Sequence, residues 1–275
     1  MTAPFSLLMS VYAGDDPEHF ERALSSSTRA QTVPPAQVVL VQDGPLGEAL
    51  EAAVLAAVEA SPVPVETLRL DSNQGLTAAL TAGLERCEHD IVARMDADDI
   101  SLPERFARQL PLLEDGRDLV GGGMLEFADE GGRVLAQRTP PIGAEQIRDY
   151  ARFHQPFSHP TVVFRKRAVL AAGGYQPMGR MEDYWLFARM IAGGAEVDNV
   201  AEPVVMYRVG TGAYSRRGGR EQWRSEMLLQ RAFRRIGFTS RREYLRNVAV
   251  RGVYRFVPEG LRTTLYRRFI ARGGR

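Results

Sequence analysis

The chain lacks the features that mark membrane-spanning, disulfide-bonded and zinc-binding proteins. Its 275 residues contain one cysteine, Cys87, which excludes an internal disulfide and a cysteine-based zinc site. No stretch approaches the roughly 18 consecutive apolar residues of a transmembrane helix. The first apolar run, 5–11, is too short for a signal peptide and has no basic residues before it. We therefore expect a cytoplasmic protein in which Cys87 is a small core residue on a helix.

Acidic residues are scarce in the C-terminal part of the chain. Residues 216–275 contain 17 arginines and 4 acidic residues, a net charge of +13, so residues 1–215 carry −12. This division predicts an acidic body, 1–215, and a basic helical extension, 216–275. A charge asymmetry of this size indicates an anionic partner for the extension, either a membrane surface or nucleic acid.

Apolar residues of the extension repeat at helical spacing over 229–236 and 245–256, and again after Pro258. Such stripes dock on the body, lie on lipid, or do both. The aromatic residues between the arginines suit amphipathic helices better than a stacking platform for bases. We therefore expect peripheral attachment to the anionic inner face of the cell membrane, and no nucleic-acid partner.

The first half of the chain alternates predicted strands with predicted helices. The expected strands are 5–11, 38–41, 65–70 and 91–95, and the expected helices are 17–27, 47–60 and 76–87. This alternation predicts right-handed β-α-β units, and so an α/β fold with a mostly parallel central sheet flanked by helices. The second half is less regular, with expected strands at 119–122, 124–127, 134–135 and 161–164, edge strands at 197–200 and 204–207, and helices at 144–153, 167–172 and 181–192.

Three carboxylates, Asp96, Asp98 and Asp99, directly follow the predicted strand 91–95. The next segment, Ser-Leu-Pro-Glu at 101–104, predicts a helix start with a serine cap and a capping box. In an open α/β sheet, ligands bind at the carboxyl ends of the strands. Like charges this close stay ionised together beside a cation, and a hard divalent ion fits best. The alternative is a solvated turn whose acids cap the next helix.

Polar residues also follow two earlier strands. Asp43 ends the second predicted strand, where an acid can accept hydrogen bonds from a ribose or a base, although Asp-Gly-Pro is also an ordinary turn. Asn73 and Gly75 follow the third strand, and Gly75 allows a close approach of the backbone to a ligand. The turn after the first strand has no Gly-x-Gly-x-x-Gly, which disfavours a dinucleotide and favours a mononucleotide.

Two further acids, Glu182 and Asp183, open the predicted helix 181–192. Acids at a helix start ordinarily complement the helix dipole as capping residues. A carboxylate across a cleft from a metal-bound phosphate can instead serve as a general base. The residues alone leave both readings open.

Seven short motifs occur in an order that resembles the family-2 glycosyltransferases of the GT-A (Rossmann-like) fold. The pattern is most similar to bacterial enzymes of exopolysaccharide, capsule and cell-wall glycan assembly, of the amylovoran-biosynthesis type, and it covers roughly residues 5–215. The motifs are Ser10-Val11-Tyr12, Val41-Gln42-Asp43-Gly44, Asn73-Gln74-Gly75, Asp96-Ala97-Asp98-Asp99, Gly173-Gly174-Tyr175, Glu182-Asp183 and Tyr207-Arg208.

The resemblance implies an inverting, metal-dependent, hexosyltransferase-type enzyme. Such an enzyme moves a sugar from a nucleoside diphosphate sugar, usually a UDP-sugar, to a lipid-linked or glycan acceptor. Asp183 matches the catalytic base, and Asp98 with Asp96 matches the Asp-x-Asp that engages Mn²⁺ or Mg²⁺. The positions that match nucleotide-sugar binding are Val11, Tyr12, Asp43, Asn73, Gly75, Arg94 and Asp96. Candidate contacts to the acceptor or to phosphate are His159, Glu182 and Arg208.

The chain departs from the family pattern at two positions. Many relatives have a histidine metal ligand two residues after the arginine that matches Arg208, and here that residue is Gly210. Coordination by the protein then rests on Asp98. The asparagine that often follows the first-strand tyrosine is Ala13 here, which weakens the expected recognition of the base. His159 is either a structural residue or a contact to the donor phosphate.

Three other functions use a similar arrangement of acids on an α/β scaffold. A sugar-phosphate nucleotidyltransferase needs a loop rich in glycine and basic residues after its first strand, and residues 12–17 are not such a loop. An aspartyl phosphatase places its Asp-x-Asp after the first strand rather than the fourth. A catalytically inactive nucleotide-binding protein on the same scaffold need not keep both Asp98 and Asp183.

Overall fold

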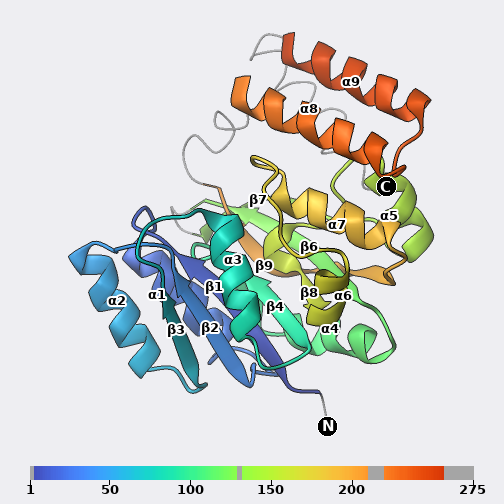
Figure 1. Cartoon of the computed structure of the whole chain (residues 1–275). Coiled ribbons are helices and arrows are strands. Elements are labelled where there is room, and N and C mark those ends of the chain that lie inside the picture. The colour runs from blue at the N-terminus through green and yellow to red at the C-terminus, as the bar shows by residue number, and fades with distance from the viewer. Residues whose placement is uncertain (1–2, 129–131, 210–219, 257–275) are drawn as a thin grey trace.

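The structure is a computed structural model that describes residues 3–128, 132–209 and 220–256, and in the last range the side chains of 222–251. Figure 1 shows a central sheet with helices on both faces, and two further helices, α8 (Arg220–Arg235) and α9 (Arg241–Phe256), packed together at one end. None of the helices in these ranges is both long and apolar enough to cross a membrane. Residues 210–219 and the predicted apolar stripe after Pro258 lie outside the described residues.

Nine strands of the described residues form one sheet in the order β3-β2-β1-β4-β8-β6-β9-β5, with β7 paired to β6. Parallel pairing joins β3, β2, β1 and β4, as predicted, and also joins β6 to β9. The remaining pairs are antiparallel. The strands are β1 (Phe5–Val11), β2 (Gln37–Gln42), β3 (Val65–Arg69), β4 (Ile91–Met95), β5 (Ile100–Ser101), β6 (Leu119–Phe127), β7 (Val134–Arg138), β8 (Val163–Arg165) and β9 (Val197–Arg208).

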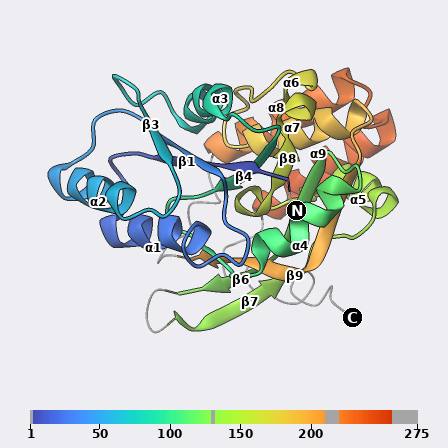
Figure 2. The ribbon, with the colours of Figure 1, turned by 90° about the horizontal axis from the view of Figure 1, so that it is seen from below.

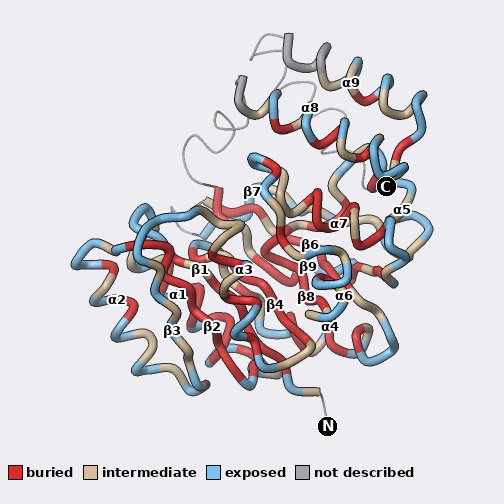
Figure 3. The backbone as a smooth tube through the Cα atoms, viewed as in Figure 1, coloured by how far each residue is buried: buried red, intermediate tan, exposed pale blue. Residues whose placement is uncertain are grey.

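Helices cover both faces of the sheet (Figures 2 and 3). One apolar core lies between the sheet and α1, α2 and α4, and a second lies between the sheet and α3, α5, α6 and α7. Cys87 is buried, as predicted, but directly follows α3 instead of lying within it. The helices are α1 (Pro17–Ser27), α2 (Glu48–Glu59), α3 (Leu76–Arg86), α4 (Arg105–Glu114), α5 (Ala144–Ala151), α6 (Lys166–Ala171), α7 (Glu182–Ala192) and a 3-10 turn, η2 (His159–Thr161).

The side chains of β4 alternate between the two cores, as the pleat of a strand requires. Ala93 and Met95 belong to the core beneath α1, α2 and α4, whereas Val92 packs in the core beneath α3 and α7. Arg94 therefore points toward the face that carries α7. This alternation decides which helix each residue at the end of β4 can meet.

The predicted helix start at 101–104 is wrong. Ser101 belongs to β5, which pairs antiparallel with β9, and α4 begins only at Arg105. The Ser101 side chain is buried and its Oγ lies 2.9 Å from the Oγ of Ser27, so it caps no helix. The pairing of β5 with β9, a strand far along the chain, overrides the local sequence pattern that favours a helix start.

The predicted edge strands 197–200 and 204–207 are one continuous strand, β9, which lies between β6 and β5. The register of its pairing with β6 shifts near Pro203. Proline cannot donate to the ladder, so the sequence resembled two strands with a break. The sheet accommodates the proline as an irregularity inside one strand.

The strand β6 also joins two predicted strands, and the glycines between them have a packing reason. A Cβ at Gly122 would lie 2.6 Å from a methyl group of Val204, and one at Gly123 would lie 2.9 Å from the main-chain oxygen of Ala201. Both neighbours belong to β9. The close approach of β9 therefore requires glycine in β6.

The two described helices of the extension pack in different ways. On α8 the predicted stripe docks on the body, because Leu229 and Phe233 are fully buried with residues of α7. On α9 the predicted stripe is not the buried face, since Leu245 is 65% exposed and the polar Asn247 is 4% exposed. The predicted stripe residues Val253 and Phe256 lie outside the described side chains.

Phe233 should account for much of the docking of α8. Its ring centroid lies 5.1 Å from that of Tyr184 and 6.3 Å from that of Trp185. We expect Phe233→Ala to lower the free energy of unfolding by about 3–5 kcal/mol, because it leaves a cavity between α8 and α7. Leu228→Ala, on the half-exposed face of the same helix, should cost no more than about 0.5 kcal/mol. Urea unfolding measures both, and equal costs would contradict this packing.

Candidate active site

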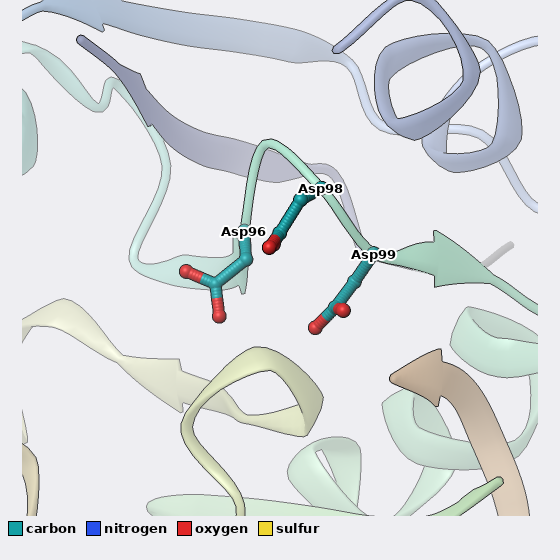
Figure 4. Close-up of side chains that lie close together, drawn as sticks. All are labelled: Asp96, Asp98 and Asp99. Atoms are coloured by element: carbon teal, nitrogen blue, oxygen red, sulfur yellow. The ribbon is translucent and has the colours of Figure 1, made fainter. Parts of the chain in front are cut away.

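The three carboxylates after β4 lie on the turn that joins β4 to β5. One ligand atom from each of Asp96, Asp98 and Asp99 lies within 4.8 Å of the others. The three side chains point to the same side of the turn (Figure 4). Asp98 is exposed, Asp96 is partly buried and Asp99 is fully buried. The structure thus brings the predicted acids together at the carboxyl end of a central strand.

Arg94 fixes the first of these carboxylates. Its guanidinium is 2% exposed and donates from both terminal nitrogens to the two oxygens of Asp96, Nη1 at 2.7 Å. A bidentate pair of this kind orients a carboxylate as well as balancing its charge. The remaining side-chain nitrogen, Arg94 Nε, is buried without a partner in the structure. Arg94 therefore fixes the position of Asp96.

A second buried arginine lies on the opposite side of the turn. Arg105 of α4 is fully buried and donates from Nη2 to the carbonyl of Arg94 at 2.7 Å and from Nη1 to Ser101 Oγ at 3.0 Å. One guanidinium thus contacts the strand before the turn and the strand after it. Burial, followed by the charge of Arg94, lowers the pKa of Arg105 to about 9.

Arg208, at the end of β9, fixes the far side of the turn. Its main-chain N–H donates to Asp99 Oδ1 at 2.8 Å, and its Nε donates to the carbonyl of Asp98 at 2.7 Å. Its guanidinium lies 4.7 Å from the ring centroid of Phe127. The predicted phosphate contact at this position is therefore also a structural support of the acid turn.

The electrostatics of the turn suit a cation. Burial, and then the charge of Asp96, raises the pKa of Asp98 and, more strongly, that of Asp99. Asp99 Oδ2 is buried with no hydrogen-bond partner in the structure. Repelling carboxylates and an unpartnered oxygen are the donor set that a hard divalent ion stabilises. The residues of the turn therefore fit the predicted Mn²⁺ or Mg²⁺.

The predicted nucleotide contacts lie at the ends of β1 and β2. Tyr12 is 48% exposed, and its ring lies so close to Gly14 that a Cβ there would come within 2.6 Å of it. Val11 is buried in the core, and its carbonyl accepts from the N–H of Asp43 at 2.8 Å. Tyr12 is thus available to a ligand, whereas Val11 has its side chain in the core.

Asp43 shapes the loop that carries the other predicted contacts. Its carboxylate accepts from the main-chain N–H of Gln74 at 2.7 Å and of Gly75 at 2.9 Å. Gly75 has φ +87°, which explains its identity, and the side next to it is open. Asn73 is exposed beside it. The structure therefore joins Asp43, Asn73 and Gly75 in one substructure at this edge of the sheet.

Asp183 lies at the first turn of α7 with both oxygens hydrogen-bonded. Oδ1 accepts from the main-chain N–H of Tyr184 at 2.7 Å, and Oδ2 accepts from Nε2 of Gln155. Burial raises the pKa of Asp183, and these two hydrogen bonds and the charge of Arg94 oppose that rise. The adjacent Glu182 also has a raised pKa, caused by burial and then by Asp183, and its Oε2 is buried without a partner in the structure.

The acid turn and the start of α7 belong to one site. The charges of Arg94 and Asp96 act on both Asp183 and Glu182. This coupling follows from the alternation of β4, which directs Arg94 toward the face of α7. The end of β4, in the first half of the chain, and the start of α7, in the second half, thus lie close together.

His159 is buried at the back of this site. Its Nε2 lies 3.0 Å from the hydroxyl of Tyr175, and burial and the charge of Arg94 hold its pKa well below the usual range. His159 is therefore neutral near pH 7 and is 7% exposed. This contact brings Tyr175 of the Gly-Gly-Tyr motif to the site.

Comparison with known proteins agrees with this geometry. The family model described as Glycosyl transferase family 2 matches residues 6–174, which is more than half of the chain. The chain belongs to glycosyltransferase family 2. The predicted family and the predicted transferase class are thereby confirmed.

Two relatives cover almost the whole family-2 chain. The amylovoran biosynthesis glycosyltransferase AmsE of Erwinia amylovora is 39% identical over 267 residues, which is 95% of this chain and 97% of the relative. The UDP-Gal:alpha-D-GlcNAc-diphosphoundecaprenol beta-1,3-galactosyltransferase of Escherichia coli is 31% identical over 274 residues, which is 98% of each. These relatives place the chain among transferases of bacterial polysaccharide biosynthesis.

Solved structures confirm the fold. The crystal structure of S. aureus TarS 1-349 in complex with UDP-GlcNAc superposes with a TM-score of 0.61 at 15% identity, over 98% of this chain and 72% of that chain. TarS 1-349 without that ligand gives a TM-score of 0.60 over 83% of this chain and 64% of that chain. The predicted GT-A fold, with a central sheet flanked by helices, is therefore confirmed in this family-2 transferase.

Two residues of the site are not among those predicted from the sequence. Gln155, between α5 and η2, is hydrogen-bonded to Asp183, and no pattern in its segment indicated this. Asp15 follows β1, and its carboxylate accepts from the N–H of Tyr12 at 3.0 Å. The charges of Asp98 and Asp96 act on Asp15, which makes it a further acid beside the turn. A pair of acids after the first strand, Asp15-Asp16, was the available signal.

Asp15 should make stability depend on pH. Burial raises its pKa from 3.8 to about 6, so its ionised form destabilises the folded state above pH 6. The penalty vanishes as the pH falls toward the ordinary value of 3.8, where the carboxyl is protonated in both states. We expect Asp15→Asn to raise the free energy of unfolding at pH 7 by about 1 kcal/mol, a value limited by partial exposure, and to change little at pH 4.

Urea unfolding with a chelator present, at several pH values, measures this difference. Asp16→Asn is the matched control because Asp16 caps α1 through Oδ1 and asparagine is an equally good cap. The control should show no gain at pH 7. A gain for Asp15→Asn that is the same at pH 4 and pH 7 would contradict the role of ionisation.

Proposed function

We propose that the protein is an inverting, divalent-cation-dependent transferase that moves a sugar from a nucleoside diphosphate sugar, most simply a UDP-sugar, to a lipid-linked or glycan acceptor in bacterial surface polysaccharide synthesis. The observation that carries the proposal is the acid turn, with its three clustered carboxylates, close enough to Asp183 that the charges of Arg94 and Asp96 act on that residue. The E. coli relative named for UDP-Gal and a diphosphoundecaprenol acceptor, and the TarS complex with UDP-GlcNAc, support the choice of substrates.

The donor is proposed to bind along the strand ends. The exposed ring of Tyr12 offers a face for the base, and the loop that Asp43 fixes offers Asn73 and the open side of Gly75. Asp43 can accept a further hydrogen bond from ribose or base, because each carboxylate oxygen has two lone pairs. Val11 would contribute through its position at the end of β1 rather than through its buried side chain.

The cation is proposed to bind at Asp98, with Asp96 beside it. Asp98 is the exposed acid of the turn, and Asp96 is oriented by Arg94. When bound, a divalent cation neutralises charge on the departing diphosphate. Arg94, Arg105 and Arg208 keep the turn in the shape that presents Asp98 to the donor.

Asp183 is proposed to be the general base. The acceptor oxygen attacks the anomeric carbon as the bond from that carbon to the diphosphate oxygen breaks, and the acceptor proton passes to the Asp183 carboxylate. Burial raises the pKa of Asp183, which makes its carboxylate a stronger base than a solvated one. Glu182, with its buried Oε2 unpartnered, is proposed to accept from a substrate hydroxyl. Arg208 and the neutral His159 are proposed to lie near phosphate or acceptor.

The division of the chain is part of the proposal. Residues 1–215 are proposed to form the catalytic unit, and residues 216–275 to form the basic extension that contacts an anionic membrane surface. Among the described side chains of α9, those of 241–251, the exposed ones are basic or apolar and none is acidic: Arg241, Arg242, Leu245, Arg246, Ala249 and Val250. Such a face suits anionic lipid headgroups and the shallow apolar layer beneath them.

Variants of the two acid sites separate the proposed roles. Asp98→Ala should weaken nucleotide binding in the presence of Mn²⁺ and lower transfer together, because one cation serves donor binding and the leaving group. Asp183→Asn should leave donor affinity nearly unchanged and lower turnover by about 10²-fold or more. Thermal shifts with UDP, GDP, CDP and dTDP, with and without Mn²⁺, measure binding. Transfer from UDP-Gal to α-D-GlcNAc-diphosphoundecaprenol, and from other UDP-sugars, measures turnover.

Two outcomes would overturn these roles. Near-normal transfer by Asp183→Asn would remove the base assignment, since a residue that only caps α7 costs up to about 1 kcal/mol of stability and leaves turnover intact. Stabilisation by none of the four nucleotides, with or without Mn²⁺, would remove the transferase proposal. Binding without turnover in the wild type, over the range of donors and acceptors, would favour the inactive nucleotide-binding alternative.

The membrane proposal predicts a charge-dependent association. The double variant Arg241→Gln/Arg242→Gln should bind anionic vesicles about tenfold or more weakly than the wild type, because each arginine near an anionic surface adds up to about 1 kcal/mol. Added salt should weaken the binding of both proteins. The matched control is Arg69→Gln/Arg86→Gln, which removes two exposed arginines from the body. Co-sedimentation measures the binding, and equal binding to neutral and anionic vesicles would contradict the proposal.

A further inference from the structure

We propose that α9 is a positioning element of the active site: it fixes the segment 152–155 so that Gln155 orients the carboxylate of Asp183. This inference rests on the proposed function, because it assigns the role through the proposed base. It adds that the basic extension completes the catalytic geometry of the body as well as offering a surface to a membrane.

The hydrogen bond between Gln155 and Asp183 is the contact through which α9 would act on the proposed base. Nε2 of Gln155 donates to Asp183 Oδ2, and the main-chain N–H of Tyr184 donates to Oδ1. The Tyr184 donor is set by the start of α7, which the body determines. The Gln155 donor comes from a segment with neither helix nor strand. The body binds that segment through the N–H groups of Phe153 and His154, which donate to the carbonyl of Tyr150, and the carbonyls of Arg152 and Phe153 take their donors from α9. A base must be oriented to within a small tolerance to accept a proton from the attacking hydroxyl.

Side chains of α9 fix that segment through its main chain. Nδ2 of Asn247 donates to the carbonyl of Arg152 at 2.8 Å, and Nη2 of Arg251 donates to the carbonyl of Phe153 at 2.8 Å. These two carbonyls lie three and two residues before Gln155. The hydrogen bonds therefore set the path of the backbone that leads to its side chain.

Further contacts between the same two segments add to these hydrogen bonds. Arg152 Nη1 lies 3.3 Å from Glu243 Oε1, and the guanidinium of Arg246 lies 4.2 Å from the ring centroid of Phe153. Main-chain carbonyls of an irregular segment need donors when they are covered. This need explains why α9 turns Asn247 and Arg251 inward and leaves Leu245 exposed, against the prediction from its apolar stripe.

The helix α8 joins α9 to the other partner of the contact. Oε1 of Gln230, a fully buried residue of α8, accepts from Nδ2 of Asn247 at 2.9 Å. Phe233 of α8 packs on Tyr184, the residue after Asp183, and the Tyr184 hydroxyl donates to the carbonyl of Ala151 at 2.8 Å. The helix that carries the base and the segment that carries its amide donor are thus both fixed against the α8–α9 pair.

The Gln155 hydrogen bond also sets the charge state of the base. A donor to a carboxylate favours the ionised form, so its loss should raise the pKa of Asp183. The other groups that act on Asp183 are unaffected by changes in α9: Arg94 favours ionisation, and Asp96 and Glu182 oppose it. The hydroxyls of Tyr175 and Tyr184 also lie near, and burial keeps both neutral by raising their pKa.

Three variants of the full-length chain test the inference. Gln155→Leu removes the donor, and Asn247→Leu and Arg251→Met remove the contacts from α9. Arg148→Met is the matched control for Arg251→Met, because Arg148 forms a half-exposed ion pair with Glu196 at 3.6 Å. The measurements are melting temperature, UDP affinity with Mn²⁺, kcat for the most active donor and acceptor, its pH dependence, and hydrogen exchange of segment 152–158.

We expect Gln155→Leu to lower kcat about tenfold or more and to move the acid limb of the pH profile up by about one unit. Asn247→Leu and Arg251→Met should lower kcat in the same direction and increase hydrogen exchange in 152–158. UDP affinity should stay within about twofold for all three variants, because the donor contacts are on the body. The control should match the wild type in every measurement.

Each outcome decides one of the two claims. A normal kcat and acid limb in folded Gln155→Leu would overturn the positioning role of Gln155. Unchanged exchange of 152–158 in both α9 variants would overturn the role of α9, whether or not any transfer is detected. Absence of transfer by the wild type would contradict the proposed function instead. Loss of UDP affinity together with kcat would show general disorder of the site and would also overturn the inference.

Discussion

The candidate active site depends on one constraint, the burial of two arginines on either side of a turn that carries three carboxylates. Arg94 pairs with Asp96 in front of the turn, and Arg105 donates to the strands on both sides of it from behind. A buried guanidinium without an acceptor is costly, so the two cations and the carboxylates must be ordered together. The acid turn is therefore fixed from both sides by buried side chains, while Asp98 stays exposed.

Because of the pleat of β4, the residues next to the turn contact both faces of the sheet. Met95 faces the core of α4, where Arg105 lies, and Arg94 faces the side of α7, where Asp183 lies. Two successive residues of β4 thus have different roles: Met95 contacts Arg105, which supports the turn, and Arg94 acts on the proposed base. Two antiparallel pairings then bring the second half of the chain beside the first: β8 pairs with β4, and the long strand β9 pairs with β5.

The two helices of the extension are joined to this arrangement in different ways. Phe233 of α8 packs on the helix of the proposed base, whereas α9 contacts the body through Asn247, Arg251 and Glu243. The outer face of α9 is left basic and apolar. One face of α9 contacts the segment that carries Gln155, and the other face suits an anionic surface. Through α9, binding to such a surface would be physically linked to the geometry of the proposed base.

The sequence by itself determined the alternating first half, from β1 to β4, because hydrophobic period and turn residues act locally there. It also placed Asp43, Asn73, Asp96 and Asp98 at strand ends, and the order of its motifs indicated the family. Only the tertiary structure decided that Ser101 forms a strand, that Leu245 is exposed and that Gln155 meets Asp183. Each of these depends on a partner far along the chain, and pairings between distant segments leave no period in the sequence of either one.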